Sequence, residues 1–410
     1  MDSSGWLILI VSILIFEFCF ESVIEYLNAR SRKQPVPFEL EGIYSTEKYI
    51  QMQSYHSQID AVGRLQSVLM FLISGFVLWF GVLGKISDWV YSISPNVWIQ
   101  SLLFFGIIGF VMFLVGLPFS YYNTFVIEEK FGFNKTTKIT FVLDIVKGFL
   151  VSVIIILPLS WLLLNLYDQF GLNFWWMAFI VLFSFSIVMS MFYTSFLLPI
   201  FNKLSPLPEG ELKNEIEKYC LQNGFKLKNL FVMDGSKRST KANAFFSGLG
   251  PQKSIVLFDT LVNNYSVHEI VAVLAHEVGH YKRKHTLQGL LMGAVLMFIT
   301  FFVLSLFLEN TQITEALGAK HHSVYLALIG FGMIYSPVSF ITGMFGNILS
   351  RKNEYEADNF AKQTYDAQYL ISALRKLSSD SFSNLTPHKL YVFFNYSHPA
   401  LLQRINNLSK

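Results

Sequence analysis

Two histidines and a glutamate in the second half of the chain have the types and spacing of a hydrolytic metal site. His276 and His280 lie four residues apart in an apolar run that begins near Val267 and repeats at helical spacing. On a helix the two imidazoles share one face, one turn apart, and can bind one metal ion. Glu277 lies beside them, where it can take a proton from a metal-bound water without being a ligand. The alternative is a chance pattern on a solvated helix end, but burying three such side chains without a partner is costly.

A catalytic zinc ion needs three protein ligands and one open position, so a third donor must come from another part of the chain. Glu354 and Asp358 are four residues apart and share one face of a predicted helix. We predict that Glu354 is the third ligand of a single zinc ion, and that Asp358 accepts the N–H of a ligand imidazole and fixes its tautomer. Glu356 is predicted to point away from this face. By itself the segment also fits a solvated start of a charged helix.

A histidine and an arginine near the end of the chain are candidates for stabilising a transition state. His398 precedes a short predicted helix that contains Arg404. Beside a zinc site they could stabilise the oxyanion of a tetrahedral intermediate, although isolated histidines usually have structural partners only. His285 is placed outside the site because it would lie about half a turn round the helix from His276. The remaining histidines considered are treated as background: His268, His321, His322 and His388.

Short strand-like runs precede the histidine helix and could hold a peptide. The predicted order is a turn-rich linker at 205–210, a charged amphipathic helix at 211–223, and strands at 230–233, 242–247 and 254–258. An extended peptide can pair its backbone along an exposed strand edge with little regard to sequence. Asn243 and Ala244 are the candidate substrate-binding residues on such an edge. The alternative is an ordinary packed strand.

The composition is that of a membrane protein. Of 410 residues, 53% are hydrophobic, 16% aromatic and only 14% charged, and 41 are phenylalanines, which excludes an ordinary soluble domain. The net charge of +3 does not indicate a nucleic-acid partner. Cys19 and Cys220 form no CxxC pair and are predicted to be neither ligands nor nucleophiles. Because the first residues carry no basic side chain and the apolar stretch continues past Phe20, we expect a retained membrane helix and no cleaved signal.

Seven apolar segments are long enough to cross a hydrocarbon core of about 30 Å. They cover residues 5–27, 65–84, 97–121, 145–167, 174–200, 287–308 and 324–349. Lysine and arginine are frequent in the first and third connecting loops and sparse in the second, fourth and sixth, so the basic loops should face the cytoplasm. The N-terminus then lies outside, and the two polar regions after the fifth and seventh segments share the cytoplasmic side and can meet.

The first apolar segment carries an acidic stripe. Glu17, Glu21 and Glu25 recur at four-residue spacing and so share one helix face. Carboxylates at membrane depth normally face protein or water, so the stripe could line a polar interior. Alternatively, Glu25 is interfacial and the other two pair with neighbouring helices.

These residues also carry a resemblance to a known family. The matching stretches follow one another along nearly the whole chain, at 125–135, 206–210, 243–248, 255–261, 276–280, 351–358 and 397–404. On them the chain resembles the type I CAAX prenyl proteases, integral-membrane zinc metallopeptidases of the a-factor-converting type. The resemblance implies seven transmembrane helices around a water-filled chamber. It assigns His276, His280 and Glu354 as zinc ligands, Glu277 as general base, Asp358 as support for a ligand, and His398 and Arg404 as neighbours of the substrate.

The family removes the C-terminal tripeptide of prenylated CAAX proteins, and some members cut a second, upstream site. The compact loop 309–323 and the small insertion between 201 and 276 make this chain more similar to a prokaryotic member. Many such organisms lack prenylated CAAX proteins, so the resemblance implies the reaction and leaves the natural substrate open. The implied location is the cell (inner) membrane of a prokaryote, or the endoplasmic reticulum or inner nuclear membrane of a eukaryote.

We therefore expect a mainly α membrane protein with a zincin-like α+β region on the cytoplasmic side. The expected regions are transmembrane helices in 1–200, a catalytic region in 201–286, two more transmembrane helices in 287–350 and a C-terminal catalytic region in 351–410. The expected partners are a peptide or protein substrate, with or without an isoprenyl group, and membrane lipid. Two alternatives stay open: a quality-control zinc protease acting on unprenylated membrane proteins, and a transporter or channel with a structural zinc.

Overall fold

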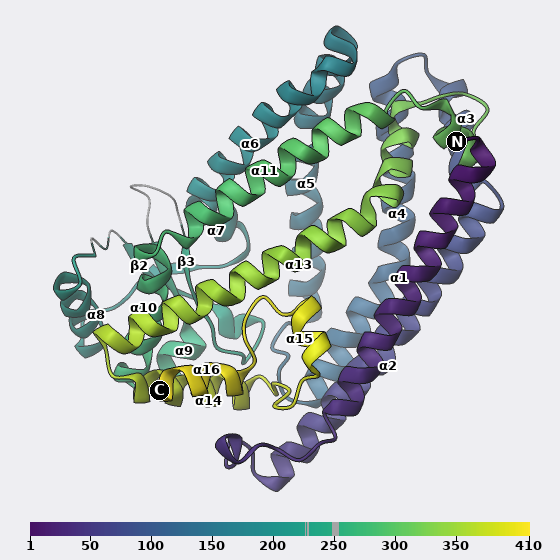
Figure 1. Cartoon of the computed structure of the whole chain (residues 1–410). Helices are drawn as coiled ribbons and strands as arrows, with labels where there is room; N and C mark the ends of the chain where they lie inside the picture. The colour runs from purple at the N-terminus through teal and green to yellow at the C-terminus, as the bar shows by residue number, and fades with distance from the viewer. Residues whose placement is uncertain (226, 228, 248–253) are drawn as a thin grey trace.

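Long apolar helices form most of the computed structural model, which describes residues 1–225, 227, 229–247 and 254–410 (Figure 1). Six stretches of these residues are long and apolar enough to cross a membrane: Ser3–Ser31, Thr46–Trp79, Val97–Glu128, Lys138–Phe201, His285–Phe307 and Val324–Thr364. The stretch Lys138–Phe201 holds two of the seven predicted segments, in helices α5 (Lys138–Phe170) and α6 (Phe174–Phe192). The two helices are separated by one 3-10 turn that begins at Gly171, where φ is +54°.

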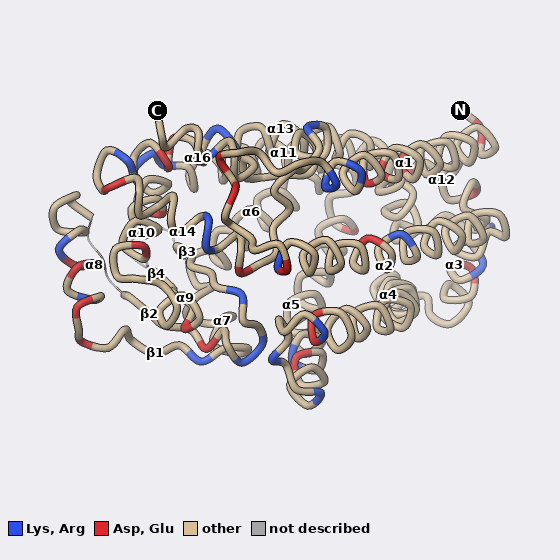
Figure 2. The backbone as a smooth tube through the Cα atoms, turned by 90° about the horizontal axis from the view of Figure 1, so that it is seen from below, with Lys and Arg blue, Asp and Glu red and all other residues tan. Residues whose placement is uncertain are grey.

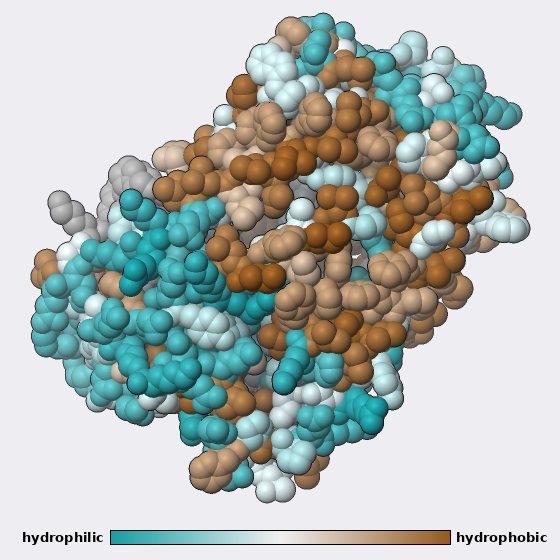
Figure 3. Space-filling view, in the orientation of Figure 1, coloured by the Kyte–Doolittle hydropathy of each residue, from teal (hydrophilic) through white to brown (hydrophobic). Residues whose placement is uncertain are grey.

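The outer surface of the helix bundle is apolar. Its remaining long helices are α1 (Ser3–Ser31), α2 (Thr46–Trp79), α4 (Val97–Tyr122), α11 (His285–Phe307) and α13 (Val324–Thr364). Helices α4, α6 and α11 contain no Asp, Glu, Lys or Arg (Figure 2). In Figure 3 apolar side chains form a broad band across the middle of the bundle, whereas the lower left part of the molecule and its upper right end are largely hydrophilic. Such an apolar surface fits the hydrocarbon of a bilayer.

Two helices extend well beyond the apolar segments predicted for them. Helix α2 begins at Thr46, where the side chain of Ser45 accepts a hydrogen bond from the backbone N–H of Lys48. Helix α13 continues without a break through 41 residues, from the membrane into the polar region. Hydropathy finds only the lipid-facing part of such a helix, because the polar part has an ordinary amphipathic composition.

Two short helices, α3 (Val82–Ile93) and α12 (Thr311–Ala316), lie at the end of the bundle farthest from the polar region (Figure 2). Gly84 on α3 accepts no side chain, because a Cβ there would lie 2.0 Å from the carbonyl carbon of Gly318. Its backbone N–H donates to Leu317 O at 3.0 Å. The two segments are therefore joined backbone to backbone.

The acidic stripe of α1 is only partly buried. Glu21 and Glu25 are exposed and Glu17 is half-buried. Within the described part of the chain none of the three forms an ion pair, which gives no support to pairing with neighbouring helices. That the stripe lines a polar interior stays a prediction.

The polar region contains a small mixed sheet with the order β1-β2-β4-β3. Its strands are β1 (Leu204–Pro206), β2 (Asn229–Met233), β3 (Ala244–Ser247) and β4 (Ser254–Phe258). Strands β2 and β4 are parallel, and β3 pairs antiparallel with β4 only, so β3 is an edge strand of the described sheet. Strand β1 was not predicted; it begins one residue before the expected linker, which contains two prolines.

Helix α10 (Val267–Lys282) lies at the centre of the polar region. A capping box begins it, in which Ser266 accepts from the Glu269 N–H and the Glu269 carboxylate accepts from the Ser266 N–H. Its buried side packs in one apolar cluster with helix α8 (Glu211–Gln222), strand β4 and helix α14 (Ala367–Asp380). Along α13 it approaches so closely that a Cβ on Gly279 would lie 3.0 Å from both Cα and O of Ala357. The short helices α15 (Lys389–Asn395) and α16 (Leu401–Ser409) complete this region.

Candidate active site

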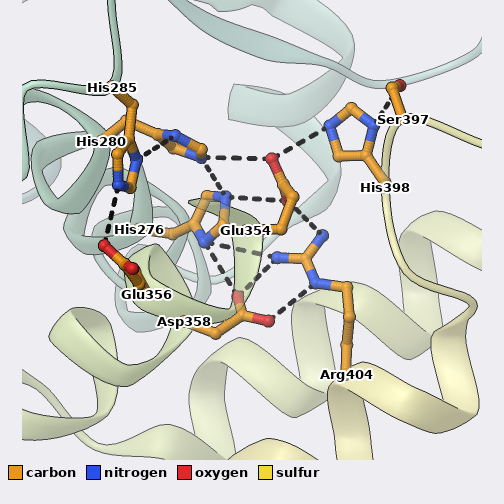
Figure 4. A network of polar contacts seen from close by, with 9 residues as sticks. All are labelled: His276, His280, His285, Glu354, Glu356, Asp358, Ser397, His398 and Arg404. Carbon is orange, nitrogen blue, oxygen red and sulfur yellow. Dashed lines mark hydrogen bonds and ion pairs between the residues drawn. The ribbon is translucent and has the colours of Figure 1, made fainter. Parts of the chain in front are cut away.

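Helices α10 and α13 bring the three predicted ligands together (Figure 4). The Nε2 atoms of His276 and His280 face each other at 3.1 Å. Glu354, from α13, places its Oε1 3.2 Å from Nε2 of His280 and its Oε2 3.5 Å from Nε2 of His276. One donor atom from each residue lies within 4.8 Å of the other two. The side chains therefore converge from two helices far apart in sequence, as predicted.

The other nitrogen of each imidazole already has a partner. His276 Nδ1 lies 2.8 Å from Oδ1 of Asp358, as predicted, and His280 Nδ1 lies 3.0 Å from Nδ1 of His285. When each Nδ1 carries the proton, each Nε2 has a free lone pair directed at the same point. Oε2 of Glu354 is buried and has no hydrogen-bond partner among the described residues. Two lone pairs and a carboxylate oxygen without a hydrogen bond fit a cation, and this donor set is typical of catalytic zinc.

The surroundings favour positive charge at this point. Burial and the charge of Arg404 lower the pKa of His276, but the neighbouring carboxylates of Asp358 and Glu354 outweigh them and raise that pKa to about 9. The site thus stabilises a proton where a metal cation would bind. Its carboxylates are well shielded from solvent, with the side chains of Glu354 and Asp358 exposed by 5% and 0%.

Arg404 lies under the site and is held by the carboxylates of α13. Its Nε lies 2.9 Å from Oδ2 of Asp358 and its Nη2 2.6 Å from Oδ1, a bidentate pair. Its Nη1 lies 3.5 Å from Oε2 of Glu354. Burial lowers the pKa of Arg404, but the charge of Asp358 and the hydrogen bonds to it raise the pKa above its usual value. The arrangement fixes Asp358 behind His276; contact of Arg404 with an oxyanion stays a prediction.

A cavity of about 850 Å³ opens over the three ligands. Glu277 is half-buried in its wall, next to His276 on α10. His398, from the loop between α15 and α16, also lines it, with Nε2 3.3 Å from Oε1 of Glu354 and a side chain that is 62% exposed. Glycines on α11 and α13 line another wall: Gly289, Gly293 and Gly346. The cavity thus brings together the candidate base, the candidate oxyanion donors and the candidate ligands.

Asn243 and Ala244 line the same cavity, at the start of edge strand β3. The backbone carbonyl of Asn243 accepts a hydrogen bond from the N–H of Phe258 at 3.0 Å, so the β4 side of this segment is already paired. The other side of β3 carries no strand of the described sheet. The position of the strand is that predicted for peptide binding, whereas its use for binding stays a prediction. The last residue of the matched stretch 243–248 lies outside the described residues.

Two residues beside the candidate ligands, His285 and Glu356, were not predicted to take part in the site. His285 was expected half a turn away on a continuing helix, but α10 ends at Lys282, and Lys284 adopts the left-handed conformation with φ of +60°. The chain turns there, and His285 comes back against His280. Glu356 was predicted to point away from the face of Glu354 and Asp358; its Oε2 lies 3.3 Å from His285 Nε2. No glycine marks this turn, so the sequence offered no clear signal for it.

Two family models together match almost the whole chain. The model of the CAAX prenyl protease N-terminal region, with five membrane helices, matches residues 25–203, and the model of peptidase family M48 matches residues 206–410. CAAX prenyl protease 1 of Saccharomyces cerevisiae is 32% identical, over 98% of this chain and 95% of the relative. The human CAAX prenyl protease 1 homolog is 33% identical, over 91% of this chain and 88% of the relative.

A solved structure agrees over the same length. The crystal structure of Ste24p from S. mikatae superposes with a TM-score of 0.93 at 31% identity, covering 99% of both chains. The match includes both the membrane helices and the polar region, which gives no support to the transporter or quality-control alternatives. The protein is an integral, multi-pass membrane metalloendopeptidase with a metal cofactor, and it belongs to the CAAX prenyl proteases of peptidase family M48.

Proposed function

We propose that this protein is a one-zinc endopeptidase that cleaves near the C-terminus of CAAX-type proteins or peptides on the cytoplasmic side of its membrane. The observation that carries the proposal is the convergence of His276, His280 and Glu354 on one point beside Glu277, inside a cavity. Relatives named as CAAX prenyl proteases match the chain over nearly its full length. The matches extend over 95% and 96% of two such relatives, which supports the substrate class.

We assign the proton transfers to Glu277. Zinc bound by the three ligands would polarise the scissile carbonyl and make a water molecule more acidic. The Glu277 carboxylate, half-buried in the cavity wall beside His276, would accept the proton of the attacking water and pass it to the leaving amine. Glu277 serves both steps because one carboxyl group can act first as a base and then as an acid.

The negative charge that develops on the carbonyl oxygen needs donors aimed at it. His398 lines the cavity with most of its imidazole exposed, and it would donate a hydrogen bond to that oxygen. Arg404, held by Asp358, contributes a fixed positive charge beneath Glu354. With both groups in place before substrate binds, little reorganisation would be needed during the reaction.

The substrate would lie as an extra strand along β3. Its backbone would pair with the open side of the segment that begins at Asn243 and Ala244, which lines the cavity. Backbone pairing places an amide bond near the ligands with little dependence on side chains, so selection of the substrate must come from elsewhere. We propose that an isoprenyl group, or another apolar group near the C-terminus, supplies it and brings the substrate to the membrane.

Purified full-length protein loaded with zinc should be incubated with matched prenylated and unprenylated CAAX peptides, and the products identified by mass. We expect loss of the C-terminal tripeptide, faster from the prenylated peptide. Glu277→Gln should bind zinc normally and turn over at least about 100-fold more slowly, because general-base catalysis contributes this much or more. Equal cleavage of unprenylated or unfolded chains would refute the substrate class, and full activity of Glu277→Gln would refute the assigned base.

A further inference from the structure

The two ligand imidazoles have different supports. Nδ1 of His276 contacts a carboxylate directly, that of Asp358 at 2.8 Å. Nδ1 of His280 instead contacts Nδ1 of His285 at 3.0 Å, and Nε2 of His285 contacts Oε2 of Glu356 at 3.3 Å (Figure 4). His280 therefore reaches a carboxylate only through a second imidazole.

If His280 Nε2 binds a metal ion, only one direction is possible for these hydrogen bonds. Two facing Nδ1 atoms at 3.0 Å require that one donates and the other accepts. If His280 Nδ1 accepted, its Nε2 would carry the proton and could not bind a metal. His280 Nδ1–H must then donate to His285, whose own N–H on Nε2 donates to the Glu356 carboxylate. With these directions His280, His285 and Glu356 each have a hydrogen-bond partner, and the lone pair of His280 Nε2 faces Glu354.

We propose that His285 and Glu356 are positioning residues for the metal centre: they hold His280 in the tautomer and orientation in which its Nε2 binds the cation. This inference rests on the proposed function of the site. The side chain of His285 is only 5% exposed, so water cannot easily replace it as acceptor. The side chain of Glu356 is 36% exposed, and its Oε1 lies 3.9 Å from Nζ of Lys352. The contacts that run from His280 through His285 to Glu356 therefore end at the protein surface.

The backbone conformation before His285 supports this role. Lys284 is one of two non-glycine residues with positive φ in the described structure. The left-handed conformation costs such a residue about 1–2 kcal/mol. Without this turn, helix α10 would continue and carry His285 away from His280. The backbone strain at Lys284 thus occurs at the turn that brings the imidazole of His285 into contact with His280.

The test uses variants that keep or remove the acceptor. His285→Phe keeps an aromatic ring but offers His280 Nδ1 no acceptor, whereas His285→Asn keeps an oxygen near the position of Nδ1. Glu356→Leu removes the carboxylate at a partly exposed position, where folding is least affected. His268→Phe is the control, because His268 lies near the start of α10, the helix that carries His276 and His280, and its side chain contacts Tyr365 and Tyr369.

Zinc dissociation constants of the full-length proteins should be measured by chelator competition, together with the absorption spectrum of the Co²⁺-substituted forms. Loss of a support for a metal-bound imidazole typically costs 10–100-fold in affinity. We expect about this loss and an altered Co²⁺ spectrum in His285→Phe, a smaller loss in Glu356→Leu, recovery in His285→Asn and no change in His268→Phe. The thermal midpoints of the metal-free variants identify any that are misfolded.

Wild-type zinc affinity and spectrum in both His285→Phe and Glu356→Leu would overturn the inference. Equal weakening in His285→Asn and His285→Phe would overturn it too, since size and not the acceptor would then matter. Failure of the proposed function would look different: the wild type itself would bind no zinc or cleave no peptide. The inference can fail alone, with the wild type binding zinc and cleaving peptide while the affinities of the variants are unchanged.

Discussion

The contact between Gly279 and helix α13 predicts that adding one methyl group will weaken the metal centre. In Gly279→Ala the new Cβ would lie 3.0 Å from Cα and O of Ala357 and 3.1 Å from Cβ of Phe360. Carbon atoms normally pack at about 3.5–4.0 Å, so α10 and α13 must separate by about 0.5–1 Å. Metal–ligand distances tolerate only about 0.2 Å. Since the histidines lie on α10 and Glu354 on α13, the shift falls directly on the site.

Two opposing effects on stability are expected in Gly279→Ala. Overpacking costs about 1–3 kcal/mol, whereas replacing glycine by alanine inside a helix gains about 0.5–1 kcal/mol. If about 1.4 kcal/mol or more of the strain acts on the bound state, zinc affinity falls at least tenfold. Chelator competition and thermal unfolding in detergent measure the two quantities. Gly148→Ala on α5 is the control, because a Cβ there meets no atom within 4 Å. Unchanged affinity and higher stability in Gly279→Ala would refute the reasoning.

Three further predictions concern Asp358 and the capping box at the start of α10. Asp358→Asn replaces the carboxylate that contacts His276, and we expect zinc affinity to fall about 10–100-fold in chelator competition; wild-type affinity would show that this contact does not orient the ligand. Ser266→Ala removes the N-cap of α10 and should lower the free energy of unfolding by about 1 kcal/mol, which Ser266→Asp should largely restore. Burial raises the pKa of Glu269, but hydrogen bonds from Ser266 and Ser372 outweigh it and lower that pKa below the ordinary 4.5. The higher melting temperature of wild type over Glu269→Gln should therefore hold above pH 4.5 and vanish as the pH falls through the lower, folded-state pKa; a difference independent of pH would contradict this.

The parts of the site that follow helical spacing could be predicted. His276 with His280, and Glu354 with Asp358, lie four residues apart, and four residues bring two side chains to one helix face whatever the rest of the fold does. The approach of the helix that carries Glu354 to the histidine helix was predicted from metal chemistry, because a catalytic zinc ion needs a third protein ligand besides the two histidines. The membrane character followed from composition.

The parts that depend on backbone breaks could not be predicted in this way. His285 reaches the site only because Lys284 adopts a positive φ, and lysine gives no indication of such a turn. Glu356 was assigned by its angle on the helix, but its side chain is long enough to reach His285 from a neighbouring face. Similarly, hydropathy alone did not resolve the polar beginning of α2, because tertiary contacts stabilise it. Tyr55, for example, is buried against Phe131 and Phe133.

Helix α13 mechanically links the bilayer to the catalytic chemistry. It is one helix of 41 residues, about 60 Å long at 1.5 Å per residue, with Glu354 and Asp358 near one end and lipid-embedded turns along much of the rest. A change in hydrocarbon thickness alters the tilt of a spanning helix, and a rigid arm of this length transmits the tilt to its far end. The two histidines are carried by a different helix, outside the bilayer. Because α10 packs against this end of α13, we expect a change in membrane thickness to act on the packing that holds Glu354 beside His276 and His280.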